Sequence, residues 1–182
     1  MKGLLDIELG HFEPPTEELL CAPLPDCEHI DLSVGAGPLP SFLSGDRQSL
    51  RVRIRYFWRP SDGHLFARAW FGPGSKGPPG HAHGGSIAAL LDEVMGVCAY
   101  LNGREVLAAR IDVSYRQPLR LGSVVLAEGW VEKQSGRKVS ARARLTDVDS
   151  GVLLSDSNGL FLQLNTQQVE AYTTLLEESD GD

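Results

Sequence analysis

Alternating apolar and polar residues mark several segments of the chain as β-strands with one face in a core. Over 106–116 the odd-numbered positions from Leu107 to Tyr115 are apolar, whereas Arg110 and the following even positions are polar. A period of two residues is typical of a half-buried strand. This pattern, together with apolar runs between turn residues, predicts six strands, at 51–58, 64–71, 106–116, 124–132, 137–147 and 152–164.

One long helix is predicted between the second and third of these strands. The residues after Gly85 are apolar except for Asp92 and Glu93, and a usual stop follows at Asn102, so the helix covers 86–102. Because this helix is apolar nearly all round, other elements must enclose it. The sequence therefore predicts an α+β fold, an antiparallel sheet of about six strands wrapped around one central helix. No uninterrupted apolar segment has the length of a membrane span.

The two ends of the chain differ from its centre in composition. Residues 1–46 carry nine acids against one lysine and hold six of the eleven prolines, so we expect an acidic, proline-rich extension with a short helix around 16–21. The folded domain is expected over 47–165. Residues 166–182 predict a C-terminal helix and a polar tail.

The net charge of −7 conceals a basic central region. Residues 104–144 carry nine lysines and arginines against four acids, and 47–76 is also basic. A local surplus in an acidic protein favours an anionic ligand over nucleic acid, which usually requires a strongly basic domain. The alternative is that these arginines solvate an exposed face of the sheet.

Cysteine content and the start of the chain bear on the compartment. The three cysteines are odd in number and Cys98 falls in the apolar helix, which favours a reducing environment over a disulfide scaffold. The first residues become acidic before an apolar signal segment forms. We therefore expect a cytoplasmic protein.

Asp92 lies within the apolar helix, where a carboxylate is costly to bury. Its neighbours at three and four positions are Ala88, Ala89, Met95 and Gly96, a mostly small-residue stripe that leaves a slot beside the carboxylate. Apolar surroundings raise the pKa of a carboxyl group and make it a better base near neutral pH. Asp92 is therefore a candidate base or nucleophile. The alternative is a buried ion pair with an arginine.

Gly84 and Gly85 open the helix, where backbone N–H groups have no partner inside it. The N–H of Gly85 suits an oxyanion, with the helix dipole adding positive potential, although a glycine pair also makes plain tight turns. The His81-x-His83 pair lies in a loop without a cysteine nearby, so we expect no metal and assign His83 to positioning the loop or substrate. Ser86 follows, without the Gly-x-Ser-x-Gly elbow of a serine hydrolase.

Three motifs together carry a family resemblance: Gly-Pro-Pro-Gly-His-Ala-His-Gly-Gly at 77–85, Ala-Ala-Leu-Leu-Asp-Glu at 88–93 and Ser-Tyr-Arg-Gln-Pro at 114–118. They resemble the hotdog-fold acyl-CoA thioesterases of the phenylacetyl-CoA type, in particular the branch that includes the mammalian mitochondrial long-chain thioesterases. The most specific element is His-Gly-Gly with an aspartate nine positions after the histidine. The resemblance covers about 50–165.

The resemblance implies a hotdog fold and a homo-oligomer, either a dimer or a dimer of dimers, in which two protomers join their sheets side by side. It implies an acyl-CoA substrate, no cofactor, and a site at the interface, where the glycine N–H of one subunit faces the aspartate of the other. By that analogy Asp92 activates water or attacks the thioester, Gly85 donates to the oxyanion and His83 supports the carbonyl.

The resemblance also implies substrate contacts outside these three residues. Gly84 and Ser86 flank Gly85 and are expected to touch the substrate. The Gly136-Arg137-Lys138 segment matches a family element near the CoA phosphates, and its cationic side chains suit phosphate oxygens.

Two positions depart from the family pattern. Ala108 stands where many members carry a serine or threonine that holds the water or the acid, and Gly77 stands where some carry an asparagine. The leading hypothesis is a thioester hydrolase. Two alternatives stay open, a protein that binds acyl-CoA without hydrolysing it and a hydratase of enoyl thioesters.

Overall fold

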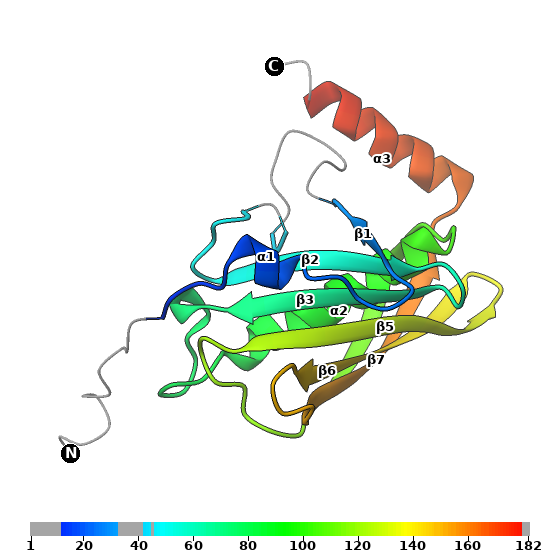
Figure 1. Ribbon diagram of the computed structural model, residues 1–182. Coiled ribbons are helices and arrows are strands. Elements are labelled where there is room, and N and C mark those ends of the chain that lie inside the picture. The colour runs from blue at the N-terminus through cyan, green and yellow to red at the C-terminus, as the bar shows by residue number, and fades with distance from the viewer. Residues whose placement is uncertain (1–11, 33–41, 45, 180–182) are drawn as a thin grey trace.

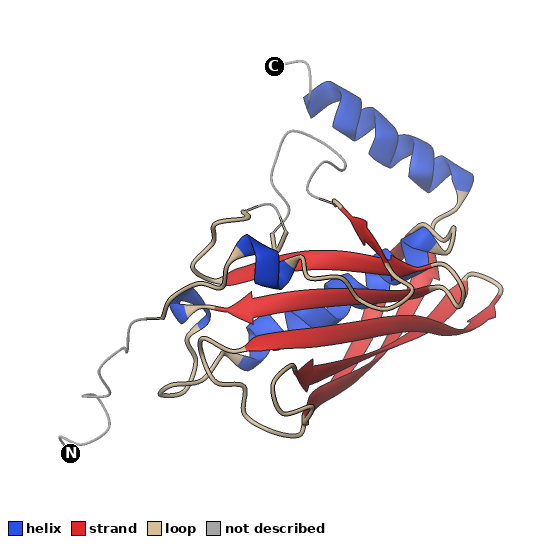
Figure 2. Cartoon of the chain, in the orientation of Figure 1, coloured by secondary structure: helices blue, strands red, loops and turns tan. Residues whose placement is uncertain are grey.

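In this computed structural model the described residues are 12–32, 42–44 and 46–179. Their strands form one antiparallel sheet in the spatial order β1-β2-β3-β5-β6-β7-β4, and the long helix α2 crosses one face of it (Figure 1). The strands are β1 (Glu28–Ile30), β2 (Val52–Arg59), β3 (His64–Phe71), β4 (Val106–Tyr115), β5 (Val124–Ser135), β6 (Lys138–Asp147) and β7 (Leu153–Gln163). The helices are α1 (Glu17–Leu20), α2 (Gly84–Leu101) and α3 (Thr166–Ser179), with a 3₁₀ turn, η1, at Pro73–Ser75 (Figure 2).

The core lies between α2 and the inner face of the sheet. The buried side of α2 packs on strands β3 to β7, whose inward residues are mainly alanine, valine and leucine. Gly129 of β5 permits a close approach, because a Cβ there would stand 2.6 Å from Cγ1 of Val94 and 3.0 Å from its carbonyl oxygen. The helix is therefore held firmly against the sheet, and so are the residues that it presents.

The architecture expected from the periodicity is confirmed. All six predicted strands and the central helix are present, although α2 begins at Gly84 instead of at 86. The sheet has one more strand than expected, because β1 pairs with β2, with Glu28 opposite Trp58 and Ile30 opposite Tyr56. Three residues without alternation carry no strand signal, so β1 could not be predicted.

Among the described residues, α2 is the one helix long and apolar enough to cross a membrane by length and composition. The interrupted apolar runs of the sequence did not suggest such a segment. In the fold one side of this helix packs against the sheet, and burial accounts for the apolar residues on that side.

β4 forms the edge of the sheet farthest from β1. Its alternating sequence predicts one buried face, but Leu107 and Tyr115 are 47% and 53% exposed, and most of its other side chains are exposed too. One reason is that the pairing with β7 shifts register between Ala108 and Arg110, so Leu107 does not share a face with Ile111 and Val113, which pack against the core. The other is its position: β4 pairs with β7 on one side, and in the described part of the chain no strand pairs with its other side.

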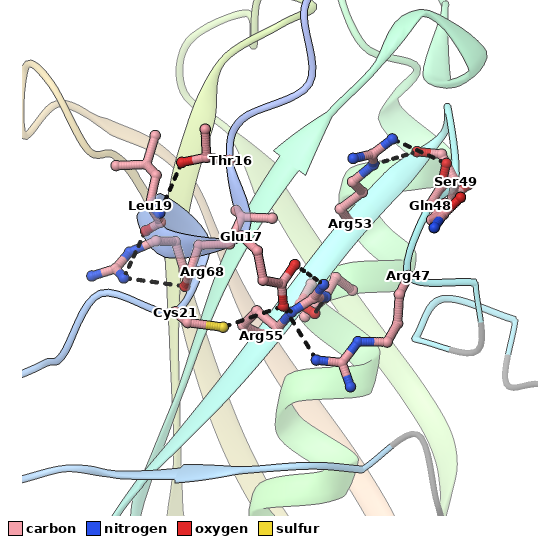
Figure 3. Close-up of polar contacts among 12 residues, drawn as sticks. Thr16, Glu17, Leu19, Cys21, Arg47, Gln48, Ser49, Arg53, Arg55 and Arg68 are labelled. Atoms are coloured by element: carbon pink, nitrogen blue, oxygen red, sulfur yellow. Dashed lines mark hydrogen bonds and ion pairs between the residues drawn. The ribbon is translucent and has the colours of Figure 1, made fainter.

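A short N-terminal segment lies on the outer face of the sheet, opposite α2 (Figure 1). Glu17 of α1 accepts hydrogen bonds from Arg55 of β2 at 2.6 and 2.5 Å and from Arg47 at 3.2 Å (Figure 3). Arg68 of β3 donates to three carbonyl oxygens at the end of α1, between residues 19 and 22. We call this set, Glu17, Arg47, Arg55 and Arg68, the α1 clamp.

Candidate active site

The start of α2 is organised by His83. Its Nδ1 atom accepts the N–H of Gly85 at 2.9 Å, and its carbonyl oxygen accepts the hydroxyl of Ser86 at 2.7 Å. The hydroxyl of Tyr115 donates to the carbonyl oxygen of Gly84 at 2.9 Å. The expected site residues 83–86 are therefore held together at one end of the central helix.

The bond between Gly85 and His83 has two consequences. A neutral imidazole whose Nδ1 accepts a hydrogen bond carries its proton on Nε2, so the exposed His83 ring offers an Nε2–H donor. The same bond engages the Gly85 N–H that the sequence assigns to the oxyanion. A substrate oxygen must therefore compete with Nδ1 for that N–H.

Asp92 lies two turns farther along the helix with one oxygen unpartnered. Its Oδ1 atom is buried without a hydrogen-bond partner. Burial raises the pKa of Asp92, and no charge or hydrogen bond from the described residues counteracts this rise. In the described part of the chain no arginine pairs with Asp92, so the alternative of a buried ion pair is not observed there.

The adjacent acid, Glu93, has a different environment. It projects about 100° farther round the helix, and its Oε1 atom accepts the hydroxyl of buried Tyr56 at 3.0 Å. Burial also raises the pKa of Glu93, while the Tyr56 hydrogen bond lowers it. No sequence signal pointed to Tyr56, because it is 37 residues away.

A single chain does not bring Gly85 and Asp92 together. They are seven residues apart on α2, which separates them by about 10 Å along the helix axis. An oxyanion donor and a base that act on one carbonyl must both reach the reacting atoms. The pair can therefore act on one thioester only if a second chain supplies one of the two groups.

A cleft of about 830 Å³ opens beside the start of α2. His83, Gly85 and Ser86 line one side of it, and residues of 42–52 and 74–76 line the rest. We call it the helix-start cleft. Its lining includes Arg51 and Lys76, which sequence reasoning did not single out because no motif contains them.

His81 does not line this cleft, which contains His83. Its Nδ1 atom is 2.8 Å from the carbonyl oxygen of Pro79, and it lines a second cleft of about 330 Å³ together with Gly84 and Tyr115. Over the described ranges, no three His, Cys, Asp or Glu side chains gather as a group that could hold a metal ion.

The Gly136-Arg137-Lys138 segment lies at the opposite end of β4 from the start of α2. Arg137 Nε donates to the carbonyl oxygen of Gln163 at 2.9 Å, and Gln163 pairs with Val106, the first residue of β4. Tyr115, the last residue of β4, touches Gly84. Since ten strand residues span about 30 Å, one chain does not bring this segment to residues 83–86.

An antiparallel sheet curled around one long helix, with glycines at the helix start and an acid inside it, defines a hotdog-fold protein. The sequence model of the thioesterase superfamily matches residues 79–154, which include the start of α2 and Asp92. Over residues 79–154 the chain is therefore similar to the thioesterase superfamily, and its fold is the hotdog fold.

Individual proteins support this assignment. The chain is 40% identical over 120 residues to the acyl-coenzyme A thioesterase THEM4 of Xenopus laevis, covering 65% of this chain and 54% of the relative. It is 31% identical over 112 residues to the acyl-coenzyme A thioesterase THEM5 of Mus musculus, covering 62% and 45%. The chain thus spans about half the length of these relatives.

A solved structure shares the fold. The PaaI protein from the phenylacetic acid degradation operon of E. coli superimposes with a TM-score of 0.58 at 13% identity, covering 67% of this chain and 86% of that protein. At this identity the likeness concerns the fold alone.

Proposed function

We propose that this protein hydrolyses acyl-CoA thioesters to a carboxylic acid and CoA. The observation that carries the proposal is Asp92, a carboxyl group with a raised pKa and one buried, unpartnered oxygen inside the central helix of a thioesterase-superfamily domain. The acyl-coenzyme A thioesterase relatives point to the same substrate class.

The proposed site belongs to a homo-oligomer whose smallest unit is a dimer. The free edge of β4 offers backbone groups for pairing with the β4 of a second protomer, which would join the two sheets. Tyr100 on the uncovered side of α2 is 60% exposed, and a partner can bury it. In such a dimer Gly85 of one protomer faces Asp92 of the other, which resolves their separation within one chain.

The proposed reaction is general base catalysis by Asp92. The carboxylate takes a proton from water as the water oxygen bonds to the thioester carbonyl carbon, and the carbonyl oxygen becomes an oxyanion. The Gly85 N–H and the Nε2–H of His83 donate to that oxygen. The carbon–sulfur bond then breaks, and the CoA thiolate leaves and takes up the proton. Direct attack by Asp92 through an acyl-enzyme anhydride is the variant of this mechanism.

Release of the CoA thiol from a series of acyl-CoA substrates tests the proposal. Wild-type protein is expected to turn over at least one of them, and Asp92→Asn is expected to lose this activity while it keeps its fold. Glu93→Gln is the matched control, because it removes the adjacent acid. The proposal is wrong if wild type shows no turnover, or if Asp92→Asn retains full activity.

A second candidate is an acyl-CoA-binding protein without hydrolytic activity. It is favoured by Ala108, which offers no hydroxyl to hold water, and by the engagement of the Gly85 N–H with His83. Tight CoA binding without thiol release would support it. Including crotonyl-CoA among the substrates and following water addition tests the hydratase alternative in the same experiment.

A further inference from the structure

We propose that Arg51 and Lys76 bind the phosphate groups of the CoA moiety in the helix-start cleft. This inference rests on the proposed function, because that function supplies acyl-CoA as the ligand. It is an alternative to the expectation that Arg137 and Lys138 lie near the CoA phosphates, because the fold separates that segment from residues 83–86 within one protomer.

Ser75 connects the segment of Arg51 to the start of α2. This residue is 5% exposed; its hydroxyl donates to the carbonyl oxygen of Arg51 at 2.7 Å, and its own carbonyl oxygen accepts the N–H of His83 at 2.7 Å. Lys76 follows it directly in the chain. The backbones of both cationic residues are therefore fixed relative to the helix start, although they come from segments distant in sequence.

The charges of Arg51 and Lys76 are unpaired in the described part of the chain: no hydrogen bond or ion pair joins either side chain to a described residue. The neighbouring arginines behave differently, since Arg53 donates to backbone carbonyls at 3.0 and 3.1 Å and Arg55 pairs with Glu17. Both side chains are exposed, so neither has to give up a described partner in order to bind an anion.

The rest of the cleft suits the remainder of acyl-CoA. Asp46 is the one acid among its described lining residues, and its carboxylate accepts the N–H of Gln48 at 2.9 Å. Phe42 and Leu50, which are 82% and 58% exposed, add apolar surface for the pantetheine arm. The positive end of α2 adds to the attraction for phosphate.

Arg137 is less available than the cleft cations. Its guanidinium donates to the carbonyl oxygen of Gln163 and to Oε1 of Gln168, both at 2.9 Å. Binding phosphate there would require these bonds to be shared or broken.

The test compares acyl-CoA with the matching acyl-pantetheine, which lacks the phosphates. In the Arg51→Ala/Lys76→Ala variant, KM for acyl-CoA is expected to rise at least about tenfold, the effect of losing a charge-assisted hydrogen bond. Its kcat and its kinetics with acyl-pantetheine should stay near the wild-type values. Adenosine 3′,5′-bisphosphate should compete with acyl-CoA in wild type and much less in the variant.

Charge-retaining and remote substitutions serve as controls. Arg51→Lys/Lys76→Arg should restore most of the affinity. Lys133→Ala removes an exposed cation on β5 and should leave KM unchanged. The Arg137→Ala/Lys138→Ala variant is measured in parallel. The inference fails if the cleft variant has a wild-type KM for acyl-CoA, or if KM for acyl-pantetheine rises equally.

Direct binding of CoA separates this inference from the proposed function. If CoA binds in a manner that depends on Arg51 and Lys76 but wild type releases no thiol, the phosphate site stands and the hydrolysis does not. If wild type hydrolyses acyl-CoA and only Arg137→Ala/Lys138→Ala raises KM, the hydrolysis stands and this phosphate site is wrong.

Discussion

The α1 clamp and the helix-start cleft both place cationic side chains beside the end of a helix. They differ in whether those side chains are paired with other described residues. In the clamp, Arg55 meets Glu17 at 2.5 Å, and the Arg68 guanidinium donates to carbonyl oxygens at the end of α1 (Figure 3). The Arg68 guanidinium also lies 5.2 Å from the centre of the Phe57 ring. In the cleft, Lys76 has no described partner. Paired charges fix the extension to the sheet, whereas the exposed charge of Lys76 is held by no described residue and is available to a ligand.

Asp92 extends this comparison to the negative groups. The Arg55 hydrogen bond lowers the pKa of Glu17 to about 2, while burial alone raises the pKa of Asp92. A perturbed, unpartnered carboxyl group is a usual mark of a functional site, whereas a paired one usually serves the fold. Substitutions in the two regions should therefore separate effects on rate from effects on stability.

The largest expected effect is on catalysis. Asp92→Asn should lower kcat for acyl-CoA by about 10²–10⁴-fold, the usual contribution of a general base. The measurement is thiol release under saturating substrate, with circular dichroism to confirm the fold. If kcat falls by less than about tenfold, another group is the general base, and Asp92 no longer illustrates the difference between functional and structural charges.

The second effect is on stability in the clamp. Arg55→Ala leaves Glu17 without its main partner and should lower the free energy of unfolding by about 1–2 kcal/mol, a value limited by the exposure of Glu17. Urea unfolding measures it. Activity at a temperature where the variant is folded should stay near wild type. Unchanged stability would show that the clamp does not hold the extension.

How far the sequence alone leads differs between fold and site. The strands and α2 were predictable because apolar periodicity is a local signal that persists over many residues. The N-cap at His83 also carried a signal, since a side chain with an acceptor before a helix start often bonds the N–H two positions on. The signal is weak, because histidine is not a usual cap residue.

The remaining features depend on tertiary contacts. Tyr56 reaches Glu93 across 37 residues, and Ser75 links Arg51 to the helix start. Neither contact can be predicted from residue spacing or composition. The exposure of β4 follows from its register shift against β7 and from its edge position, neither of which the alternation of its residues encodes.

The third prediction concerns acid stability in the clamp. The folded-state pKa of Glu17 lies below its ordinary value of 4.5, so its stabilising contribution is present above pH 4.5 and is lost as pH falls toward about 2. Allowing for solvent screening, Glu17→Gln should remove about 1 kcal/mol of stability at pH 7 and almost none at pH 2. Urea unfolding of both proteins across this range measures the difference. An equal difference at both ends would mean that the contact is not ionic.

The smallest effect has the opposite sign and lies at Asp92. The folded-state pKa of this carboxyl group is raised, so the folded protein binds its proton more tightly than the unfolded chain does, and its contribution to stability falls as pH rises through the raised pKa. Asp92→Asn removes the charge from the buried setting, so at pH 8 the variant should unfold with the same free energy as wild type or with a gain below about 1 kcal/mol. Urea unfolding of wild type and Asp92→Asn at pH 8 and at pH 4 measures this difference. A clear loss of stability at pH 8 would mean that the carboxylate has a stabilising partner in the assembled protein, and Asp92 would then belong with the paired charges of the clamp.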